Sequence, residues 1–445
     1  MYKPVWAIVF LCVFPIIAWG GETTGNFENH WPQWRGPHAN GVSPHGTPPV
    51  TWSESENIKW KVEIRGKGHA TPIIWGDLVF ISTAVETDKQ VRNQNAGAEQ
   101  GERRGPPITS TSNIHNFAVL AINRSDGKIV WRRTAREELP HEGIHPTGTW
   151  ASNSPVTDGE HVYVYFGSRG LYCYDLKGNL KWEKDLGDMA IKLSFGEGSS
   201  PVLHGDKLVV NWDHEGESFI IALDKKTGEE IWKVSRDEST SWATPLIVES
   251  AGKTQVVTSA TRRIRSYDLA NGELLWESTG MTANVIPSPV TSDGMLYVMS
   301  GFRGNALQAI RLADAKGDLA STGAIVWTLD KDTPYTPSPL LYESKLYFLK
   351  SNDGILACFD ARTGEPHFSR KRLEGIEGVY ASPVGANGRV YIASRNGMTQ
   401  VIKHGTEYEL LVTNKLDDSF SASPAVAGNQ LYLRGEQNLY CIAEK

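Results

Sequence analysis

The 445-residue chain has few cysteines, almost no long apolar run and little excess charge of either sign. Four cysteines are too few for a small scaffold stapled by disulfides. A formal net charge of −6 excludes the basic surface typical of proteins that bind nucleic acid or anionic membranes. Beyond residues 1–20 no apolar stretch is long enough to span a bilayer, so we expect no transmembrane segment in the mature chain.

The one apolar run lies at the N-terminus and has the pattern of an export signal. Lys3 precedes an apolar stretch from Val5 to Ile17, and small residues follow at Ala18 and Gly20. A basic start, a short apolar core and small residues at its end are typical of a secretory signal peptide. We therefore predict a signal peptide over residues 1–20 and a protein of the periplasm or the extracellular space.

The chain is rich in a repeated unit. Eight Ser-Pro or Thr-Pro pairs recur 41 to 50 residues apart, except for a first step of 83 residues that requires an insertion. Each pair opens a set of short strand-like runs separated by tight turns. A repeat of this length built from short strands is typical of propeller blades. The pairs are Thr71-Pro72, Ser154-Pro155, Ser200-Pro201, Thr244-Pro245, Ser288-Pro289, Ser338-Pro339, Ser382-Pro383 and Ser423-Pro424.

One large aromatic residue marks the same place in most repeats, four residues after a turn glycine. The clearest copy, residues 199–232, predicts a four-stranded antiparallel meander whose outer strand carries this aromatic. We expect these rings to pack between neighbouring blades. In the seventh repeat the expected position holds Glu409, which predicts the least tightly docked blade. The predicted docking residues are Trp60, Trp131, Trp182, Trp232, Trp276, Trp327 and Phe368.

The last repeat is one strand short. After Ser423-Pro424 only three strands remain, while residues 57–64, ahead of the first Thr-Pro pair, look like an outer strand with Trp60 in the aromatic place. Open strand edges are costly and prone to aggregation. The sequence therefore predicts an all-β, eight-bladed β-propeller with four antiparallel strands per blade, its last blade closed by the N-terminal strand.

The segments outside the repeat have their own composition. Residues 21–57 predict an extended N-terminal arm lying over the ring, residues 58–445 the propeller, and residues 86–113 a flexible insertion in the first blade. Cys173, Cys358 and Cys441 share one position in repeats that are not neighbours in an eight-bladed ring. We expect them to serve core packing and to form no disulfide.

Candidate binding residues gather in the loops of the first four repeats. Loops at one end of a propeller converge on its axis, so they could form a binding funnel; a solvated polar rim is the alternative. Pro140 and Gly143 argue against the helix that a zinc site at His141 and His145 would need, so no metal site is predicted. No catalytic residue is predicted, because the expected channel positions lack titratable groups. The candidates are His141, His145, Trp150, Asn153, Asp213, His214, Arg236 and Trp242.

The blade pattern resembles the pyrroloquinoline quinone (PQQ) repeat. It is visible in ALDKKTGEEIW (222–232), SYDLANGELLW (266–276) and CFDARTGEPHF (358–368), and the resemblance covers residues 58–445. Quinoprotein alcohol dehydrogenases and the outer-membrane protein assembly factor BamB share this repeat. The resemblance implies the propeller fold, which by itself does not assign a function.

The chain departs from the dehydrogenases of this family. They typically carry a vicinal cysteine pair against PQQ, and some carry a c-type haem, but no two cysteines are adjacent here and no Cys-x-x-Cys-His occurs. Their calcium-binding and catalytic acids match no motif in this chain, so we expect neither PQQ nor calcium. The leading hypothesis is an exported, monomeric, non-catalytic scaffold with a protein partner in the cell envelope. The alternatives are a PQQ-dependent dehydrogenase and a saccharide- or peptide-binding propeller.

Overall fold

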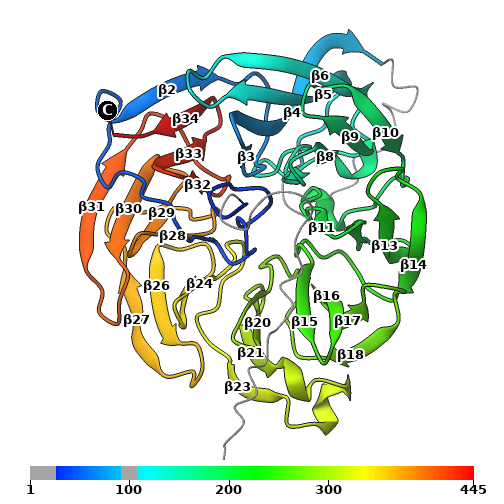
Figure 1. The fold of residues 1–445 in the computed structure, drawn as a ribbon, viewed down its shortest axis with the longest axis vertical. Coiled ribbons are helices and arrows are strands. Elements are labelled where there is room, and N and C mark those ends of the chain that lie inside the picture. The colour runs from blue at the N-terminus through cyan, green and yellow to red at the C-terminus, as the bar shows by residue number, and fades with distance from the viewer. Residues whose placement is uncertain (1–26, 92–107, 445) are drawn as a thin grey trace, which may run out of the picture.

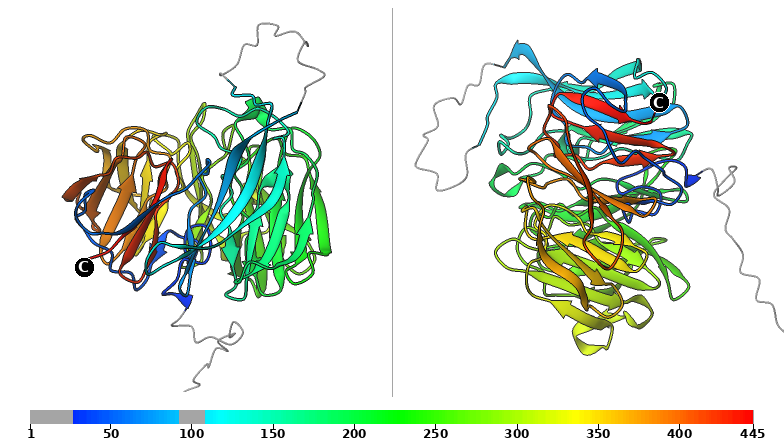
Figure 2. Two further views of the ribbon diagram at one scale, coloured as in Figure 1. Left: turned by 90° about the horizontal axis from the view of Figure 1, so that it is seen from above. Right: turned by 90° about the vertical axis from the view of Figure 1, so that its left-hand side faces the viewer.

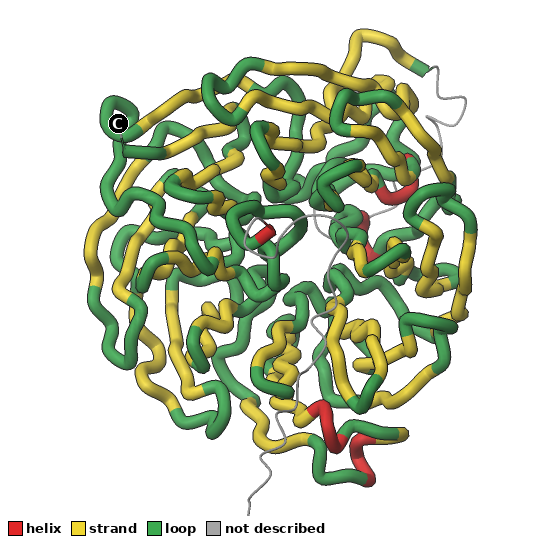
Figure 3. The backbone as a smooth tube through the Cα atoms, viewed as in Figure 1, coloured by secondary structure: helices red, strands yellow, loops and turns green. Residues whose placement is uncertain are grey.

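A computed structural model of the protein describes residues 27–91 and 108–444, which form a flat ring of eight blades (Figure 1). The eight-bladed all-β prediction is confirmed. Short runs rich in β-branched and aromatic residues, joined by tight turns, favour this meander over helix. Helical structure among the described strands and loops is limited to short turns (Figure 3). They include η1 (Gly167–Arg169), η2 (Lys192–Ser194), η3 (Leu312–Asp314) and η4 (Leu319–Ser321), and Phe27 at the start of the described residues is also helical.

Each blade runs from an inner strand beside the axis to an outer strand on the rim. Blade 1 contains β3 (Ile73–Trp75), β4 (Leu78–Gln90), β5 (Asn113–Asn123) and β6 (Ile129–Glu138). Blade 2 contains β7 (Val156–Thr157), β8 (His161–Tyr165), β9 (Leu171–Asp175) and β10 (Leu180–Lys184). Blade 3 contains β11 (Val202–His204), β12 (Lys207–Trp212), β13 (Ser218–Asp224) and β14 (Glu230–Arg236). Blade 4 contains β15 (Leu246–Ser250), β16 (Lys253–Ser259), β17 (Ile264–Asp268) and β18 (Leu274–Ser278).

The second half of the ring repeats this order. Blade 5 contains β19 (Val290–Ser292), β20 (Met295–Ser300), β21 (Ala306–Arg311) and β23 (Ile325–Leu329). Blade 6 contains β24 (Leu340–Tyr342), β25 (Lys345–Leu349), β26 (Ile355–Asp360) and β27 (Pro366–Arg372). Blade 7 contains β28 (Val384–Ala386), β29 (Arg389–Ala393), β30 (Met398–Lys403) and β31 (Leu410–Lys415). Blade 8 contains β32 (Ala425–Ala427), β33 (Gln430–Arg434), β34 (Asn438–Ile442) and β2 (Ile58–Glu63).

The two ends of the repeat region meet in blade 8. Strand β2 pairs antiparallel with β34, which places Trp60 opposite Cys441 (Figure 1). The predicted closure by an N-terminal strand is therefore confirmed. Cys173, Cys358 and Cys441 are buried in the third strands of blades 2, 6 and 8 and are not bonded to one another, as expected.

The Ser/Thr-Pro pairs form a chain of hydrogen bonds around the axis. In seven consecutive steps the backbone N–H of the Ser or Thr in one blade donates to the hydroxyl of its counterpart in the next, at 2.9 to 3.1 Å. Proline follows each of these residues and has no N–H of its own to satisfy. At the seam between blades 8 and 1 the buried hydroxyl of Thr71 accepts no such bond in the described part of the chain.

The predicted docking tryptophans join adjacent blades on the outer side. Trp60, Trp131, Trp182, Trp232 and Trp327 each donate the indole N–H to a backbone carbonyl of the following blade, at 2.9 to 3.0 Å. Each ring also lies against the turn glycine of that blade. A Cβ at Gly127, for example, would stand 2.8 Å from the Trp60 ring, and Gly127 has φ +75°, so only glycine suits this contact.

Three joints depart from this arrangement. Trp276 donates to Gln255 of its own blade, since an insertion in blade 5 lays β22 (Gly317–Asp318) along β18. Phe368 has no N–H to donate. In blade 7 the strand register places Val412, not Glu409, in the aromatic position, which corrects the expectation from residue spacing.

The N-terminal arm supplies the aromatic ring that blade 7 lacks. Trp52 of the arm stacks on Tyr391 of blade 7 at 6.4 Å and 17°. Its backbone N–H donates to Asn414 at 2.9 Å, and the Asn414 amide donates back to Val50 at 2.8 Å. Trp52, from outside the repeat, thereby supplies the aromatic contact that Val412, the residue in the aromatic position of blade 7, does not make.

The start of the arm fills the central channel from one face of the ring, which we call the arm face (Figures 1 and 2). Trp31 is fully buried and exchanges two backbone hydrogen bonds with Ile74 of blade 1. The Trp34 indole donates to Ser288 of blade 5. The buried Arg35 guanidinium donates to the carbonyls of two Ser-Pro prolines, Pro383 and Pro339, both at 2.7 Å. From there β1 (Val42–Ser43) pairs parallel with β28.

The opposite face, the loop face, is extended by blade 1. Strands β4 and β5 reach farther into the range 86–113 than the sequence suggested, because Glu86 pairs with His115 and Gln90 with Asn113 (Figure 2). The predicted signal peptide and residues 92–107 of the predicted insertion lie outside the described residues. No helix in the described ranges is long and apolar enough to cross a membrane.

Candidate functional site

The eight predicted binding residues all lie in or beside the loops of blades 1 to 4 on the loop face. Six of them line an open groove or one of two small cavities, whereas His214 and Arg236 line none of these three. His145 and Trp150 line the groove, which has a volume of about 610 Å³. His141 and Trp150 line the first small cavity. Asn153, Asp213 and Trp242 line the second.

The small cavity beside His141 holds a compact acid–base cluster. Glu197 accepts a hydrogen bond from the Ser168 backbone N–H at 2.8 Å and a short one from the Ser168 hydroxyl. His141 Nε2 lies 3.4 Å from Glu197, 3.9 Å from Glu142 and 2.8 Å from the Met189 carbonyl oxygen. This links the loops that precede blades 2 and 3.

Burial controls the protonation of this cluster. It raises the pKa of Glu142 to about 7 and that of Glu197 to about 7, because the apolar surroundings disfavour both carboxylates. Burial, together with the nearby Arg169, lowers the pKa of His141. The cluster therefore changes charge close to neutral pH.

We expect the contribution of Glu142 and Glu197 to the stability of the protein to fall as the pH rises from 5 to 8. Both carboxyls have an ordinary pKa of 4.5, so the unfolded chain releases these protons at lower pH than the folded state does. The folded state therefore loses stability progressively until the protons also leave it near pH 7, and the loss remains above that pH. Replacing Glu197 by glutamine should raise the free energy of unfolding at pH 8 by about 1–3 kcal/mol and flatten this fall. Denaturant unfolding at pH 5, 6.5 and 8 measures both effects.

His141 acts in the opposite sense. Because the pKa of His141 is lowered in the folded state, its contribution to the stability is lost as the pH falls through the ordinary value of 6.5. This contribution is present in both proteins, so the difference in unfolding free energy between wild type and Glu197→Gln reports on the Glu197 carboxyl alone. Glu217→Gln, at an exposed position in a neighbouring loop, is the matched control and should leave the profile unchanged. If the unfolding free energy of the Glu197→Gln variant depended on pH as steeply as that of wild type, the raised pKa assigned to Glu197 would be contradicted.

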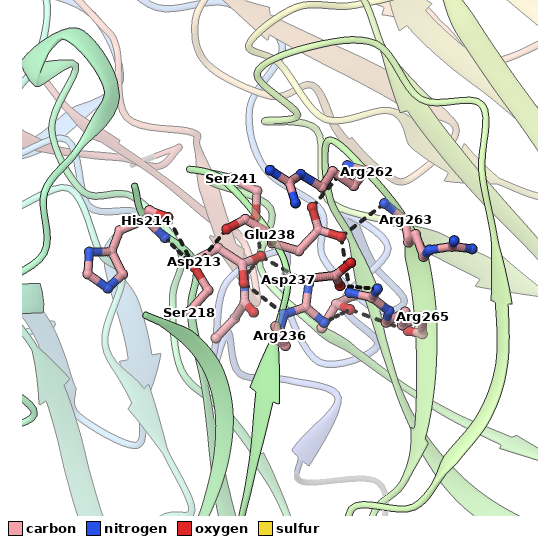
Figure 4. A network of polar contacts seen from close by, with 12 residues as sticks. Asp213, His214, Ser218, Arg236, Asp237, Glu238, Ser241, Arg262, Arg263 and Arg265 are labelled. Carbon is pink, nitrogen blue, oxygen red and sulfur yellow. Dashed lines mark hydrogen bonds and ion pairs between the residues drawn. The ribbon is translucent and has the colours of Figure 1, made fainter. Parts of the chain in front are cut away.

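A second buried network joins blades 3 and 4 (Figure 4). Arg236 and Asp213, both without solvent exposure, form a bidentate ion pair at 2.7 and 3.0 Å. Arg236 also donates to Thr258 and Tyr267, while Ser241 donates to Asp213 at 2.5 Å. Burial alone would disfavour the charged guanidinium, but the attraction of Asp213 outweighs it and raises the pKa of Arg236 above its usual value.

The network continues outward through Glu238. Its carboxylate accepts from the backbone N–H groups of Arg262 and Arg263 at 2.9 and 3.0 Å and pairs with the Arg265 guanidinium at 3.2 Å (Figure 4). Arg265 also contacts Asp237, which is largely exposed. The inner groups of the network, Asp213, Arg236 and Glu238, are thus engaged with other parts of the chain rather than directed at solvent.

The remaining candidates are engaged as well. The Asn153 amide donates to the Ser199 carbonyl at 2.7 Å. His214 Nδ1 accepts from the Ala190 N–H at 3.0 Å, and the Trp242 indole donates to Gly196 at 2.6 Å. Asn153, Asp213, His214, Arg236 and Trp242 are buried, so they are not part of a solvated rim.

Sequence reasoning missed the partners that matter most. Glu197 and Ser168 gave no signal, because they come from loops in different blades and meet only in space. His69 Nε2 and a Glu436 carboxylate oxygen are hydrogen-bonded at 2.8 Å between blades 1 and 8, beside the groove. The place of His69, two residues before Thr71-Pro72, was the one cue available for a residue near the axis.

The enclosed cavities leave no room for substrate chemistry. Each holds about 10 Å³, roughly the space of one water molecule. Ser168 and Glu197 approach the same nitrogen of His141, whereas a nucleophile and an orienting acid would need opposite ring nitrogens. Within residues 27–91 and 108–444 no three His, Cys, Asp or Glu side chains are grouped to hold a metal ion. Of these sites, the groove is the one open to a ligand.

Comparison with known proteins agrees with the fold. BamB from Moraxella catarrhalis has a similar structure, with a TM-score of 0.54 and 16% sequence identity over 81% of this chain and 98% of that protein. The quinohemoprotein alcohol dehydrogenase ADHIIG from Pseudomonas putida HK5 has a TM-score of 0.55 and 10% identity, covering 93% of this chain and 80% of that protein. No curated protein sequence matches this chain.

At these identities the two solved structures establish the fold and nothing finer. The sequence profile of one family matches residues 115–216 and 216–445, which is well over half of the chain. The chain therefore belongs to the family of PQQ-like propellers whose profile is described as outer membrane protein assembly factor BamB.

Proposed function

We propose that this protein is an exported, non-catalytic propeller that binds a protein partner in the cell envelope. The observation that carries the proposal is the contrast on the loop face. His141, Glu197 and Asp213 of the two small cavities are held in contacts between chain segments, while the groove of about 610 Å³ beside them stays open. A broad ring that carries an open groove suits binding better than reaction chemistry.

The described residues do not fit PQQ. The axis is filled by Trp31, Trp34 and Arg35 from the arm face, and the inner cavities hold about 10 Å³ each. The free thiols of Cys173, Cys358 and Cys441 lie buried in strands of separate blades, so they offer no vicinal pair. These features support a binding role over that of a quinoprotein dehydrogenase.

A saccharide site at Trp242, the other alternative, gains little support. This side chain is only 8% exposed, packs edge-on against Phe195 at 6.3 Å, and donates its N–H to Gly196. A ring held on these sides has no free face on which a sugar could stack.

Three experiments test the proposal. PQQ with Ca²⁺ should leave the thermal unfolding temperature unchanged and produce no dye-coupled alcohol oxidation; a shift together with turnover would overturn the non-catalytic assignment. Cross-linking in intact cells followed by purification should retain a defined protein partner. Without cross-linking, the purified propeller should elute as a monomer, and it should bind that partner again when the two are mixed. Export is tested by cell fractionation of a tagged full-length chain, in which retention in the cytoplasm would contradict it.

A further inference from the structure

Five blades carry a tyrosine at one shared place, the residue of the second strand that pairs with the first residue of the inner strand. In four of these blades the hydroxyl is hydrogen-bonded. In blade 5 the Tyr297 hydroxyl makes no hydrogen bond within residues 27–91 and 108–444, and Tyr297 lines a pocket of about 240 Å³ between blades 5 and 6. The bonded tyrosines are Tyr163, Tyr347, Tyr391 and Tyr432.

The pocket exists because two small residues stand where another joint has large ones. Between blades 6 and 7, His404 follows the third strand of blade 7. It stacks on Tyr342 at 4.1 Å and places Nδ1 3.0 Å from the Tyr347 hydroxyl. In blade 6 the residue after the third strand is Ala361, and in blade 5 the last residue of the inner strand, the counterpart of Tyr342, is Ser292. Both side chains are too short to reach the tyrosine hydroxyl of blade 5.

The joint between blades 7 and 8 shows what such a space accepts. There too a small residue, Ala443, follows the third strand, but the N-terminal arm fills the joint. The Tyr391 hydroxyl donates to the Pro48 carbonyl at 3.1 Å, and the Thr47 N–H donates to Gly428 in the first turn of blade 8 at 2.9 Å. A short segment with two consecutive prolines, residues 46–50, therefore occupies this joint and supplies the acceptor for its tyrosine.

The open pocket between blades 5 and 6 suits a similar, uncharged segment. Arg311 is paired with Asp314 at 3.0 Å, so the charged groups left in the lining are Arg362 and Asp293, one of each sign. The volume is smaller than the roughly 300–1,000 Å³ of most small-molecule sites. The pocket can be reached from the rim, because Val326 is 39% exposed. Its apolar walls are Met295, Val326, Leu341 and Ala361.

We propose that the pocket between blades 5 and 6 binds a short, uncharged, proline-containing segment of the partner protein, whose backbone carbonyl accepts a hydrogen bond from the Tyr297 hydroxyl. The proline rings pack on the apolar walls, and little entropy is lost because proline is already restricted in the free chain. The inference rests on the proposed binding function. It adds a contact site at the turn end of the blades, which the arm also covers, away from the groove on the loop face.

The first test mixes the purified full chain with the peptide Gly-Thr-Pro-Pro-Val, a copy of residues 46–50, and follows binding by saturation-transfer difference NMR. The tethered arm already occupies the joint between blades 7 and 8, so the added peptide reports on the open pocket. We expect saturable binding to wild type and none to Ala361→His, which places the residue of the blade 6–7 joint into the pocket. Gly-Thr-Ala-Ala-Val should bind about fivefold more weakly or less, because proline lowers the entropy lost on ordering. Equal binding of the two peptides would overturn the requirement for proline.

A second variant tests the hydroxyl without filling the pocket. Tyr297→Phe should weaken binding of the proline peptide about two- to tenfold, the range of one hydrogen bond between neutral groups. It should leave the thermal unfolding temperature unchanged, because the hydroxyl has no partner in the described part of the chain. Tyr347→Phe is the matched control: its hydroxyl is bonded to His404 and Gly405, so this variant should unfold at a lower temperature and bind the peptide as wild type does. The reverse pattern would overturn the role of Tyr297.

Partner capture separates this inference from the proposed function. After cross-linking in intact cells, Ala361→His should retain less of the partner than wild type does. Failure of the proline peptide to bind wild type, or full capture of the partner by Ala361→His, would refute the inference alone. Failure of wild type to retain any partner would instead refute the proposed function.

Discussion

Replacing Asp213 by alanine should lower the free energy of unfolding by about 3–5 kcal/mol, as expected when one member of a buried ion pair is removed. The Arg236 side chain is fully buried and donates two hydrogen bonds to the Asp213 carboxylate. Without it the guanidinium keeps only the neutral oxygens of Thr258 and Tyr267 in a site that water does not reach. Urea unfolding followed by circular dichroism gives the loss.

Two further variants identify the cause of that loss. Asp213→Ala/Arg236→Met removes both charges and should recover most of the stability, because an apolar pair of similar volume costs little in such a site. Asp237→Ala breaks an ion pair to Arg265 at a position that is 65% exposed, and should cost less than about 1 kcal/mol. A double variant as unstable as the single one would show that shape, rather than charge, dominates.

Replacing Trp60 by alanine should also cost about 3–5 kcal/mol, the usual scale for truncating a buried tryptophan. The indole donates to the Arg124 carbonyl at 3.0 Å, lies against Gly127 of blade 1, and packs 6.0 Å from Tyr432 of blade 8. Its loss should loosen the seam where the first and last strands of the ring meet. Urea unfolding and limited proteolysis together measure the effect.

Trp232→Ala is the matched control, since Trp232 makes the same contacts between blades 3 and 4, with a hydrogen bond of 2.9 Å to Leu269. Both variants should lose similar stability. Only Trp60→Ala should make residues 58–63 accessible to a protease, because these residues form β2, which Trp60 fastens to blade 1. Identical cleavage patterns in the two variants would contradict a special role for this seam.

The ring itself could be predicted from the sequence because the residues that form its turns and blade contacts recur along the chain. The Ser/Thr-Pro pairs, turn glycines and tryptophans recur at fixed spacing, and the missing strand of blade 8 follows from counting them. Reliance on the same spacing assigned the wrong residue to the aromatic position of blade 7. Glu409 stands four residues after Gly405, but the register of β31 with β30 moves Val412 into the aromatic position.

The contacts that the sequence did not reveal are those between non-equivalent segments. Trp52 completes blade 7 from the arm, and Arg35 meets two proline carbonyls more than 300 residues away. Asp213 and Arg236 were singled out from the sequence as candidate binding residues, yet their burial as an ion pair depends on packing that no spacing encodes. The groove was missed for a similar reason, since blades 8, 1 and 2 each supply part of it.

The pairing of β2 with β34 makes the ring dependent on two segments that lie far apart in the sequence. A chain interrupted anywhere before residue 438 has no strand against which Ile58 to Glu63 can settle. Such a fragment would keep an uncovered edge at each end, with the aggregation hazard that this entails. Synthesis, and any passage across a membrane, must therefore have delivered β34 before the ring can close, and a chaperone that shields unfinished blades would have its greatest effect on this protein just before that moment.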